Sequence, residues 1–273
     1  MSEQPPAKKP CDKTLVGKKA VVTGSSSGIG RAIAVELAKA GCHVLVHGGS
    51  NQAGAEETRQ LVEACGVKAH VELADLADVS SCDQLVNRAW EWGDGVDVWI
   101  NNAGADVLTT ELSEASFEDK MARLWEVDVL GTIRLARHAG QRMKSQAPSS
   151  WKPSIVNVGW DQAEVGMAGD SGEMFATTKG AVMAFTRSLA KSLAPAVRVN
   201  CLAPGWIKTA WAEEASEYWQ QRAQTESLLR RWGAPEDVAR VTRFLVSRDA
   251  DFLTGQIVAV NGGLSMAADA ETS

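Results

Sequence analysis

Residues 23–30, TGSSSGIG, constrain the fold more than any other part of the chain. They follow a β-rich run at 19–24 and open a run with apolar residues at helical spacing at 30–41. Glycines at 24, 28 and 30 allow a tight turn, a close backbone approach to a pyrophosphate, and close helix–strand packing. The helix N-terminus would present N–H groups to phosphates. The pattern predicts a nucleotide-binding βα unit, with a purely structural glycine-rich turn as the alternative.

The rest of the chain alternates short apolar runs with longer helical ones. Strand-like runs cover residues 19–24, 43–48, 68–76, 96–104, 154–160, 197–205 and 255–263. Helical spacing covers residues 30–41, 53–66, 80–93, 117–145 and 172–193, and two short helices precede the last strand. This alternation is typical of an α/β protein with a parallel sheet covered on both faces. We expect one domain over 14–266, a disordered tail at 1–13 and a second tail at 267–273.

Charge and cysteine content exclude several classes of partner. The net charge of −6 argues against a nucleic-acid or anionic membrane surface. No apolar run approaches the roughly 18 residues of a membrane span, and the first residues lack the apolar segment of a signal peptide. The five cysteines are scattered without a Cys-x-x-Cys pair, which suggests neither a disulfide framework nor a metal site. We therefore expect a cytoplasmic protein that binds no nucleic acid, membrane or metal.

The order of further motifs resembles the short-chain dehydrogenase/reductase family, and within it the 3-oxoacyl-[acyl-carrier-protein] reductases. After TGSSSGIG come ADL at 74–76, NNAG at 101–104, PGWIKT at 204–209, RWGAPEDVA at 231–239 and LTGQIVAVNGG at 253–263. The resemblance spans nearly all of 15–266 and implies a doubly wound Rossmann-type sheet of seven strands. It also implies NAD(P)(H) as cofactor, and a homotetramer formed through 117–145, 172–193 and 255–263, with a dimer as the alternative.

The resemblance assigns the cofactor site residue by residue. It implies that the glycine loop, residues 23–30, holds the pyrophosphate, that Asp75 contacts the adenine, and that 204–209 bind the nicotinamide carboxamide. For NNAG a structural turn is an equal alternative. The expected cofactor-binding residues are Gly24, Ser26, Ser27, Gly28, Ile29, Gly30, Ser50, Asn51, Asp75, Leu76, Asn102, Ala103, Gly104, Lys179, Pro204, Gly205, Ile207 and Thr209.

The end of the second predicted strand bears on the choice between NAD and NADP. A carboxylate there would pair with the ribose hydroxyls of NAD, but residues 46–51, VHGGSN, contain none. The positions where NADP usually meets a basic residue hold Ser27 and Gly49. Arg31, Ser50 and Asn51 remain to receive a 2′-phosphate. We therefore favour NADP(H) over NAD(H).

The catalytic set that the resemblance implies is largely missing. The family transfers hydride between carbonyls and alcohols with a tyrosine as general acid. A lysine lowers the tyrosine pKa and binds the ribose, a serine polarises the carbonyl, and an asparagine holds a water on the lysine. Of these only Lys179 is present. Phe175 stands at the tyrosine position and Asp128 at the asparagine position. Gly159 and Trp160 stand at the serine position, or Gln162 if the family spacing is counted back from Phe175, and residues 159–170 contain no Ser, Thr or Tyr.

Three other side chains are candidates for the missing chemistry. Asp128 is expected to pair directly with Lys179 and so to replace the water bridge. Asp161 follows Trp160 and becomes a candidate acid if apolar surroundings raise its pKa. Tyr218, the single tyrosine, belongs to 210–230, which correspond to the family's variable substrate lid, but nothing in the sequence places it at the site.

Two more acidic residues lie close to these candidates. Asp170 and Glu173 have the Asp-x-x-Glu spacing of a capping box. We therefore expect them to begin the helix that carries Lys179, with Asp170 as the N-cap.

Three functions remain open on the sequence. The first is an NADP(H)-dependent oxidoreductase with a rearranged acid. The second is a cofactor-binding pseudoenzyme, a sensor or partner subunit without fast chemistry. The third is non-redox chemistry on the same fold, against which the retained glycine loop argues. The sequence does not identify the substrate.

Overall fold

A computed structural model describes residues 13–146, 150–210, 212 and 215–264, so the expected tails lie outside it apart from Lys13. Seven strands form one sheet in the order β3-β2-β1-β4-β5-β6-β7, and every neighbouring pair is parallel. Their bounds are β1 Lys19–Val22, β2 His43–Gly48, β3 Ala69–Leu73, β4 Val98–Asn101, β5 Ser154–Val158, β6 Arg198–Pro204 and β7 Ile257–Val260. The predicted α/β fold with a doubly wound parallel sheet is confirmed.

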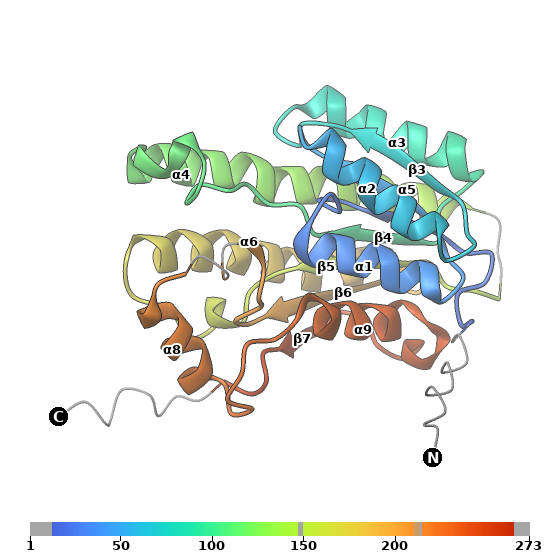
Figure 1. Cartoon of the computed structure of the whole chain (residues 1–273). Coiled ribbons are helices and arrows are strands. Elements are labelled where there is room, and N and C mark those ends of the chain that lie inside the picture. The colour runs from blue at the N-terminus through green and yellow to red at the C-terminus, as the bar shows by residue number, and fades with distance from the viewer. Residues whose placement is uncertain (1–12, 147–149, 211, 213–214, 265–273) are drawn as a thin grey trace, which may run out of the picture.

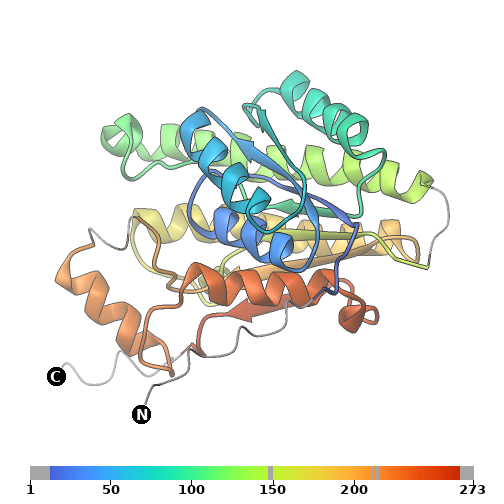
Figure 2. The same cartoon turned by 45° about the vertical axis from the view of Figure 1, so that its right-hand side comes forward.

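Helices cover both faces of the sheet (Figures 1 and 2). Helices α1 (Gly28–Lys39), α2 (Gln52–Glu63) and α9 (Pro235–Val246) pack on one face. Helices α3 (Val79–Gly93), α5 (Thr132–Ser145) and α6 (Asp170–Leu193) cover the other. Alternate strand residues enter the two cores: Val22 and Val44 join the first, whereas Val21, Leu45 and Trp99 join the second. Burial on both faces is why the strands are continuously apolar.

The remaining helical elements are short. Among the described residues they are the 3₁₀ turns Glu111–Glu114, Asp161–Ala163 and Arg248–Ala250, the π-helical segment Trp125–Gly131, α4 (Phe117–Leu124) and α8 (Glu217–Glu226). Among the described residues, no helix is both long enough and apolar enough to cross a bilayer.

The helix predicted over 117–145 is present, but it is not α-helical throughout. Helix α4 is followed by a π-helical segment, Trp125–Gly131, and only then by α5. A π segment admits an extra residue per turn, a change that hydrophobic periodicity does not reveal, and such segments often lie at functional sites. This one carries Asp128, whose side chain is buried.

The capping box predicted at the start of α6 is wrong. The helix already begins at Asp170, and its N-cap is Gly169, with φ of 90° and no side-chain cap. The left-handed backbone at Gly169 turns the chain into the helix, so Asp170 lies one position too far along to be the N-cap.

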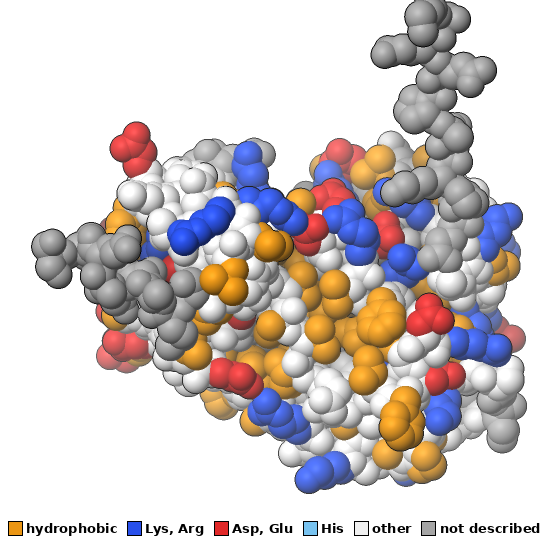
Figure 3. All heavy atoms as spheres, turned by 90° about the horizontal axis from the view of Figure 1, so that it is seen from below, with side chains coloured by type: hydrophobic (Ala, Val, Ile, Leu, Met, Phe, Trp, Pro, Cys, Tyr) orange, Lys and Arg blue, Asp and Glu red, His pale blue; other side chains and the backbone are white. Residues whose placement is uncertain are grey.

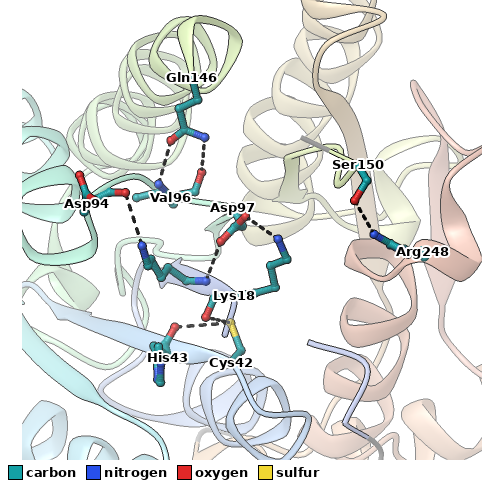
Figure 4. Close-up of polar contacts among 10 residues, drawn as sticks. Lys18, Cys42, His43, Asp94, Val96, Asp97, Gln146, Ser150 and Arg248 are labelled. Atoms are coloured by element: carbon teal, nitrogen blue, oxygen red, sulfur yellow. Dashed lines mark hydrogen bonds and ion pairs between the residues drawn. The ribbon is translucent and has the colours of Figure 1, made fainter. Parts of the chain in front are cut away.

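The edge of the sheet at the amino ends of β1 and β4 is held by a small polar network (Figure 4). The carboxylate of Asp97 accepts hydrogen bonds from Lys18 Nζ at 3.1 Å and from the Lys19 backbone N–H at 3.0 Å. Gln146, just after α5, pairs with both backbone groups of Val96 at 2.9 and 3.1 Å. These contacts fix one end of the strands and leave the carboxyl ends for ligands, as is usual in open α/β sheets.

Candidate active site

The glycine loop packs too closely for any side chain at two of its positions. A Cβ at Gly24 would lie 2.6 Å from Ala103 Cα, and one at Gly30 would lie 2.2 Å from the Gly24 carbonyl oxygen. Helix α1 begins at Gly28, and Ser27 does not cap it with its side chain. The backbone N–H groups in the first turn of α1 therefore donate no hydrogen bond to the Ser27 side chain. Such groups bind phosphates, so a dinucleotide pyrophosphate fits this loop.

The loop after β4 is held to the glycine loop by hydrogen bonds. Thr23 Oγ1 accepts hydrogen bonds from the backbone N–H groups of Asn102 at 3.0 Å and Ala103 at 3.1 Å. Asn102 Nδ2 donates to the carbonyls of Thr23 and Gly24, each at 3.1 Å. The structural role of NNAG is thus confirmed, while its contact with a cofactor stays a prediction.

The other expected cofactor residues lie along the same edge. Ser50 and Asn51 follow β2, Asp75 and Leu76 follow β3, Asn102, Ala103 and Gly104 follow β4, and Pro204, Gly205, Ile207 and Thr209 end or follow β6. Thr209 Cγ2 lies 3.7 Å from the place of a Cβ on Gly28, so the segment after β6 faces the glycine loop. Leu76 and Ile207 are buried, which leaves chiefly their backbone for a ligand.

Arg31, named above as one group for a 2′-phosphate, is engaged elsewhere. Its Nη2 donates to the carbonyls of Ser26 at 2.7 Å and Gly54 at 3.3 Å, and pairs with Glu57 at 2.8 Å. Asn51 Oδ1 accepts from the Gly54 N–H at 2.9 Å and so caps α2. Of the three groups, Ser50 is the one whose side chain makes no such contact in the described part of the chain; its backbone carbonyl accepts the Gln52 N–H at 2.9 Å.

The expected ion pair between the fourth and fifth predicted helices is present. Lys179 Nζ lies 2.7 Å from Asp128 Oδ2, and Asp128 Oδ1 accepts the Ala105 N–H at 2.8 Å. The side chains are 14% and 2% exposed, respectively. A buried carboxylate needs such partners, because an unpaired buried charge is strongly destabilising. The pairing is confirmed; a catalytic part for either residue stays a prediction.

Lys179 is part of the lining of an apolar pocket with a volume of about 240 Å³. The rings of Trp160 and Phe175 meet edge to face, with centroids 6.3 Å apart and planes at 73°. That these two residues occupy the serine and tyrosine positions of the family stays a prediction. The described lining residues are Leu108, Gly159, Trp160, Met167, Ser171, Phe175, Lys179, Trp206 and Trp219.

Helix α8 forms one wall of this pocket and is tethered by a carboxylate. Glu226 Oε2 accepts from Trp206 Nε1 at 2.7 Å and from Gln162 Nε2 at 3.2 Å, while Oε1 pairs with Arg222. The Arg222 guanidinium also lies over the rings of Trp206 and Trp219. These contacts hold the lid helix against the segment that follows β6.

The two candidate replacement acids do not line the pocket. Asp161 is 9% exposed, and its Oδ2 accepts from Asn261 Nδ2 at 3.1 Å, on the side of β7. Burial raises the Asp161 pKa to about 6, in the expected direction, and the charge of Glu226 adds to the rise. Tyr218 is 62% exposed and packs on Trp219 at 5.0 Å.

Comparison with known proteins identifies the family. Residues 24–265 match the family described as enoyl-(acyl carrier protein) reductase. The chain is 37% identical to the 3-oxoacyl-[acyl-carrier-protein] reductase FabG of Aquifex aeolicus, over 92% of this chain and 98% of that one. It is 32% identical to glucose 1-dehydrogenase 2 of Bacillus subtilis, over 93% and 97%. The chain belongs to the short-chain dehydrogenase/reductase family.

Solved structures of this family share the fold. A short-chain dehydrogenase from Burkholderia cenocepacia in complex with NADP aligns with a TM-score of 0.78 at 28% identity, covering 92% of this chain and 98% of that one. A variant of a Serratia marcescens short-chain dehydrogenase/reductase aligns with a TM-score of 0.82 at 27% identity, over the same shares. The resemblance drawn from the motifs is confirmed, and the chain carries the NAD(P)-binding Rossmann fold of this oxidoreductase family.

His47, which the sequence motifs did not single out, joins the glycine loop of this short-chain dehydrogenase/reductase to the segment after β3. His47 is 1% exposed; its Nδ1 accepts the Gly24 N–H at 3.1 Å, and its Nε2 lies 3.1 Å from the Ala74 carbonyl oxygen. Since Nδ1 accepts, Nε2 carries the proton and donates to Ala74. Burial lowers the His47 pKa to about 4, so the ring stays neutral. A polar residue inside the apolar run 43–48 was the available signal.

Ser171 was also missed. It lines the pocket together with Phe175 and Lys179. The signal was present in the sequence, because residues at i, i+4 and i+8 of a helix share one face. Ser171 thus brings a hydroxyl group to the pocket.

Proposed function

We propose that the protein is an NADP(H)-dependent oxidoreductase that transfers hydride to or from a substrate in the pocket beside Lys179. The observation that carries this proposal is the Lys179–Asp128 pair, which holds a cation at an apolar pocket. The glycine loop would hold the pyrophosphate, Asp75 the adenine, and Lys179 the nicotinamide ribose. When bound, the cofactor supplies or accepts the hydride.

The preference for NADP over NAD has two supports. Residues 46–51, which include the carboxyl end of β2, contain no carboxylate to pair with free ribose hydroxyls. The Burkholderia cenocepacia relative was solved with NADP. In the proposed complex the 2′-phosphate lies at Ser50 and the N-terminus of α2, whose N–H groups favour an anion.

The absence of the hydroxyl pair lowers the expected rate at which an ordinary ketone is reduced. A positioned general acid contributes roughly 10²–10⁴-fold in rate, and one oxyanion donor roughly 10²–10³-fold. Asp161 does not supply the proton in this proposal, because its carboxyl is held toward Asn261 rather than in the pocket. Ordinary ketones should therefore turn over slowly.

One observation favours a second function, that of a cofactor-binding pseudoenzyme. Trp160 and Phe175 pack on each other where catalysis in the family needs hydroxyl groups, while the glycine loop is intact. A sensor or partner subunit would keep the nucleotide site and lose the acid in this way.

Two measurements test the proposal. Quenching of tryptophan fluorescence by NADPH tests binding, and the absence of any change at millimolar NADPH would exclude both functions. The loss of NADPH absorbance is then followed with ketones, quinones and acyl thioesters. Turnover of any class supports the oxidoreductase. No NADPH oxidation with any of these compounds, together with activity gained in a Phe175→Tyr/Trp160→Ser variant, supports the pseudoenzyme.

The proposed assembly is a homotetramer, with a dimer as the alternative. Hydrophobic side chains gather on the face seen from below in Figure 3. Exposed large apolar side chains near α8, α9 and β7 include Leu228, Leu229, Phe244 and the fully exposed Phe252. An apolar surface of this kind marks an interaction site. Light scattering coupled to size exclusion measures the assembly, and a monomer at micromolar concentration would contradict it.

The proposed compartment is the cytoplasm. Cys42, Cys82 and Cys201 are buried thiols, as expected of a protein kept in a reducing environment. Microscopy of a fluorescently tagged full chain tests this location.

A further inference from the structure

The pocket beside Lys179 combines wide aromatic walls with few proton donors. Four of its described lining residues, Trp160, Phe175, Trp206 and Trp219, are aromatic. Among the described lining residues, Ser171 alone carries a hydroxyl group. It lies eight residues before Lys179 on α6, about 12 Å along the helix axis at 1.5 Å per residue. A group that reacts next to Lys179 is therefore remote from this hydroxyl.

The charge of the pocket is fixed as well as its shape. Lys179 Nζ is held 2.7 Å from Asp128, whose other oxygen is bound by the Ala105 N–H. The lysine is thus a positioned positive charge at one end of an apolar space. Asp128 balances this charge overall, so the gain goes to a substrate oxygen that becomes negative on reduction while in contact with Nζ itself; a cationic substrate has no such oxygen.

Substrates differ in whether they must receive a proton at the moment of hydride transfer or can receive it later. Hydride addition to an isolated ketone leaves a localised alkoxide, which requires an acid at once. Hydride addition to a quinone leaves a hydroquinone monoanion, whose charge is spread over the ring and which takes its proton later from water. Only the second class suits a pocket that has lost its acid and kept its cation.

Building on the proposed function, we infer that the substrate is a para-quinone of one or two rings. The quinone accepts the hydride from NADPH: a C–H bond of the dihydronicotinamide breaks, an O–H bond forms on one quinone oxygen, and the electron pair leaves the other oxygen negatively charged. One proton from solvent then completes the hydroquinone, so that NADPH, quinone and H⁺ give NADP⁺ and hydroquinone. Lys179 stabilises the anion, and the aromatic walls stack on the planar ring.

The size of the pocket and the place of Ser171 fit this substrate. A volume of about 240 Å³ is below the roughly 300–1,000 Å³ of pockets for drug-sized ligands, which favours a small ring system over a long acyl chain. A para-quinone has two opposed oxygens. With one near Lys179, the other points along α6 toward Ser171, whose hydroxyl donates a hydrogen bond to it.

Three bicyclic compounds of matched size test the inference. They are 1,4-naphthoquinone, 1-tetralone, which is an isolated ketone, and the cation N-methyl-3,4-dihydroisoquinolinium, which also needs no proton on reduction. NADPH oxidation, corrected for the uncatalysed rate, should be seen with the quinone alone. Calorimetry should show the quinone binding to the protein loaded with NADP⁺, a readout that involves no turnover.

Two sets of variants separate the roles of the residues. Phe175→Tyr/Trp160→Ser should raise kcat/KM for 1-tetralone by about 100-fold, because it restores an acid, and should change that for the quinone by less than tenfold. Ser171→Ala should raise the quinone KM and Kd about tenfold through the lost hydrogen bond, with kcat unchanged. Ser188→Ala, at an exposed position of α6, is the matched control and should change neither constant.

The other outcomes would overturn either the quinone inference or the proposed function. Wild-type reduction of 1-tetralone as efficient as that of the quinone would overturn the quinone inference and leave the proposed function intact. Reduction of the iminium cation alone would replace the quinone by a cationic substrate. NADPH binding without turnover or binding of any of the three compounds would also overturn the inference. Failure to bind NADPH would instead remove the proposed function itself.

Discussion

Asp161 offers a stability prediction whose sign and size follow from its surroundings. Its carboxyl is 9% exposed, and burial raises its pKa from the ordinary value of 3.8 to about 6. Below about pH 4 such a carboxyl is protonated in both the folded and the unfolded chain, so it does not lower the free energy of unfolding. Between about pH 4 and pH 6 the carboxyl ionises in the unfolded chain but stays protonated in the fold, so the folded protein loses stability; above about pH 6 it is ionised in both states and the loss levels off. A shift of about two units corresponds to about 3 kcal/mol above pH 7.

The substitution Asp161→Asn keeps the shape of the side chain and removes its charge. It should raise the free energy of unfolding by about 3 kcal/mol at pH 8 and by about half as much at pH 5. Urea denaturation followed by tryptophan fluorescence at both pH values measures the difference. Asp249→Asn replaces an exposed carboxylate and is the matched control, with a change below about 0.5 kcal/mol expected at either pH.

Two results would refute this reasoning. A gain of equal size at pH 5 and pH 8 would show that Asp161 does not ionise in this range. A loss of stability at pH 8 would show that the fold favours the charged carboxylate, through contacts stronger than the bond from Asn261.

Three other predictions concern the cofactor and catalytic residues. Lys179→Met leaves the carboxylate of Asp128 buried without its ion pair and should lower the free energy of unfolding by roughly 3–5 kcal/mol in urea denaturation; adding Asp128→Asn should restore most of the loss. His47→Phe removes both ring hydrogen bonds and should weaken NADPH binding at least tenfold in calorimetry. The NADPH affinity of the wild-type protein should show no titration of the His47 imidazole between pH 5.5 and 8, because the pKa of His47 is about 4. Gly30→Ala places a Cβ 2.2 Å from a carbonyl oxygen and should abolish fluorescence quenching by NADPH, while Gly180→Ala, with open space around it, should retain binding and stabilise the protein by about 0.5–1 kcal/mol.

Much of the site could be predicted because its signals are local. Apolar strands, helical spacing and the glycine loop each follow from a few consecutive residues, and together they fixed the order of the elements. The pairing of Asp128 with Lys179 was predicted only through the family resemblance, which placed both residues in motifs. Ser171 was predictable from helical spacing but was not named.

The sequence by itself determined a doubly wound α/β fold and a nucleotide cradle at residues 23–30, and it predicted the loss of the family's hydroxyl pair. The tertiary structure decided which way the side chains face. It turned Asp161 toward Asn261, a hundred positions away, and away from the pocket, and it used His47 to join two loops. The physical reason is that periodicity and backbone freedom are properties of neighbouring residues. Burial, pKa and hydrogen-bond partners depend instead on segments that meet only when the chain has folded.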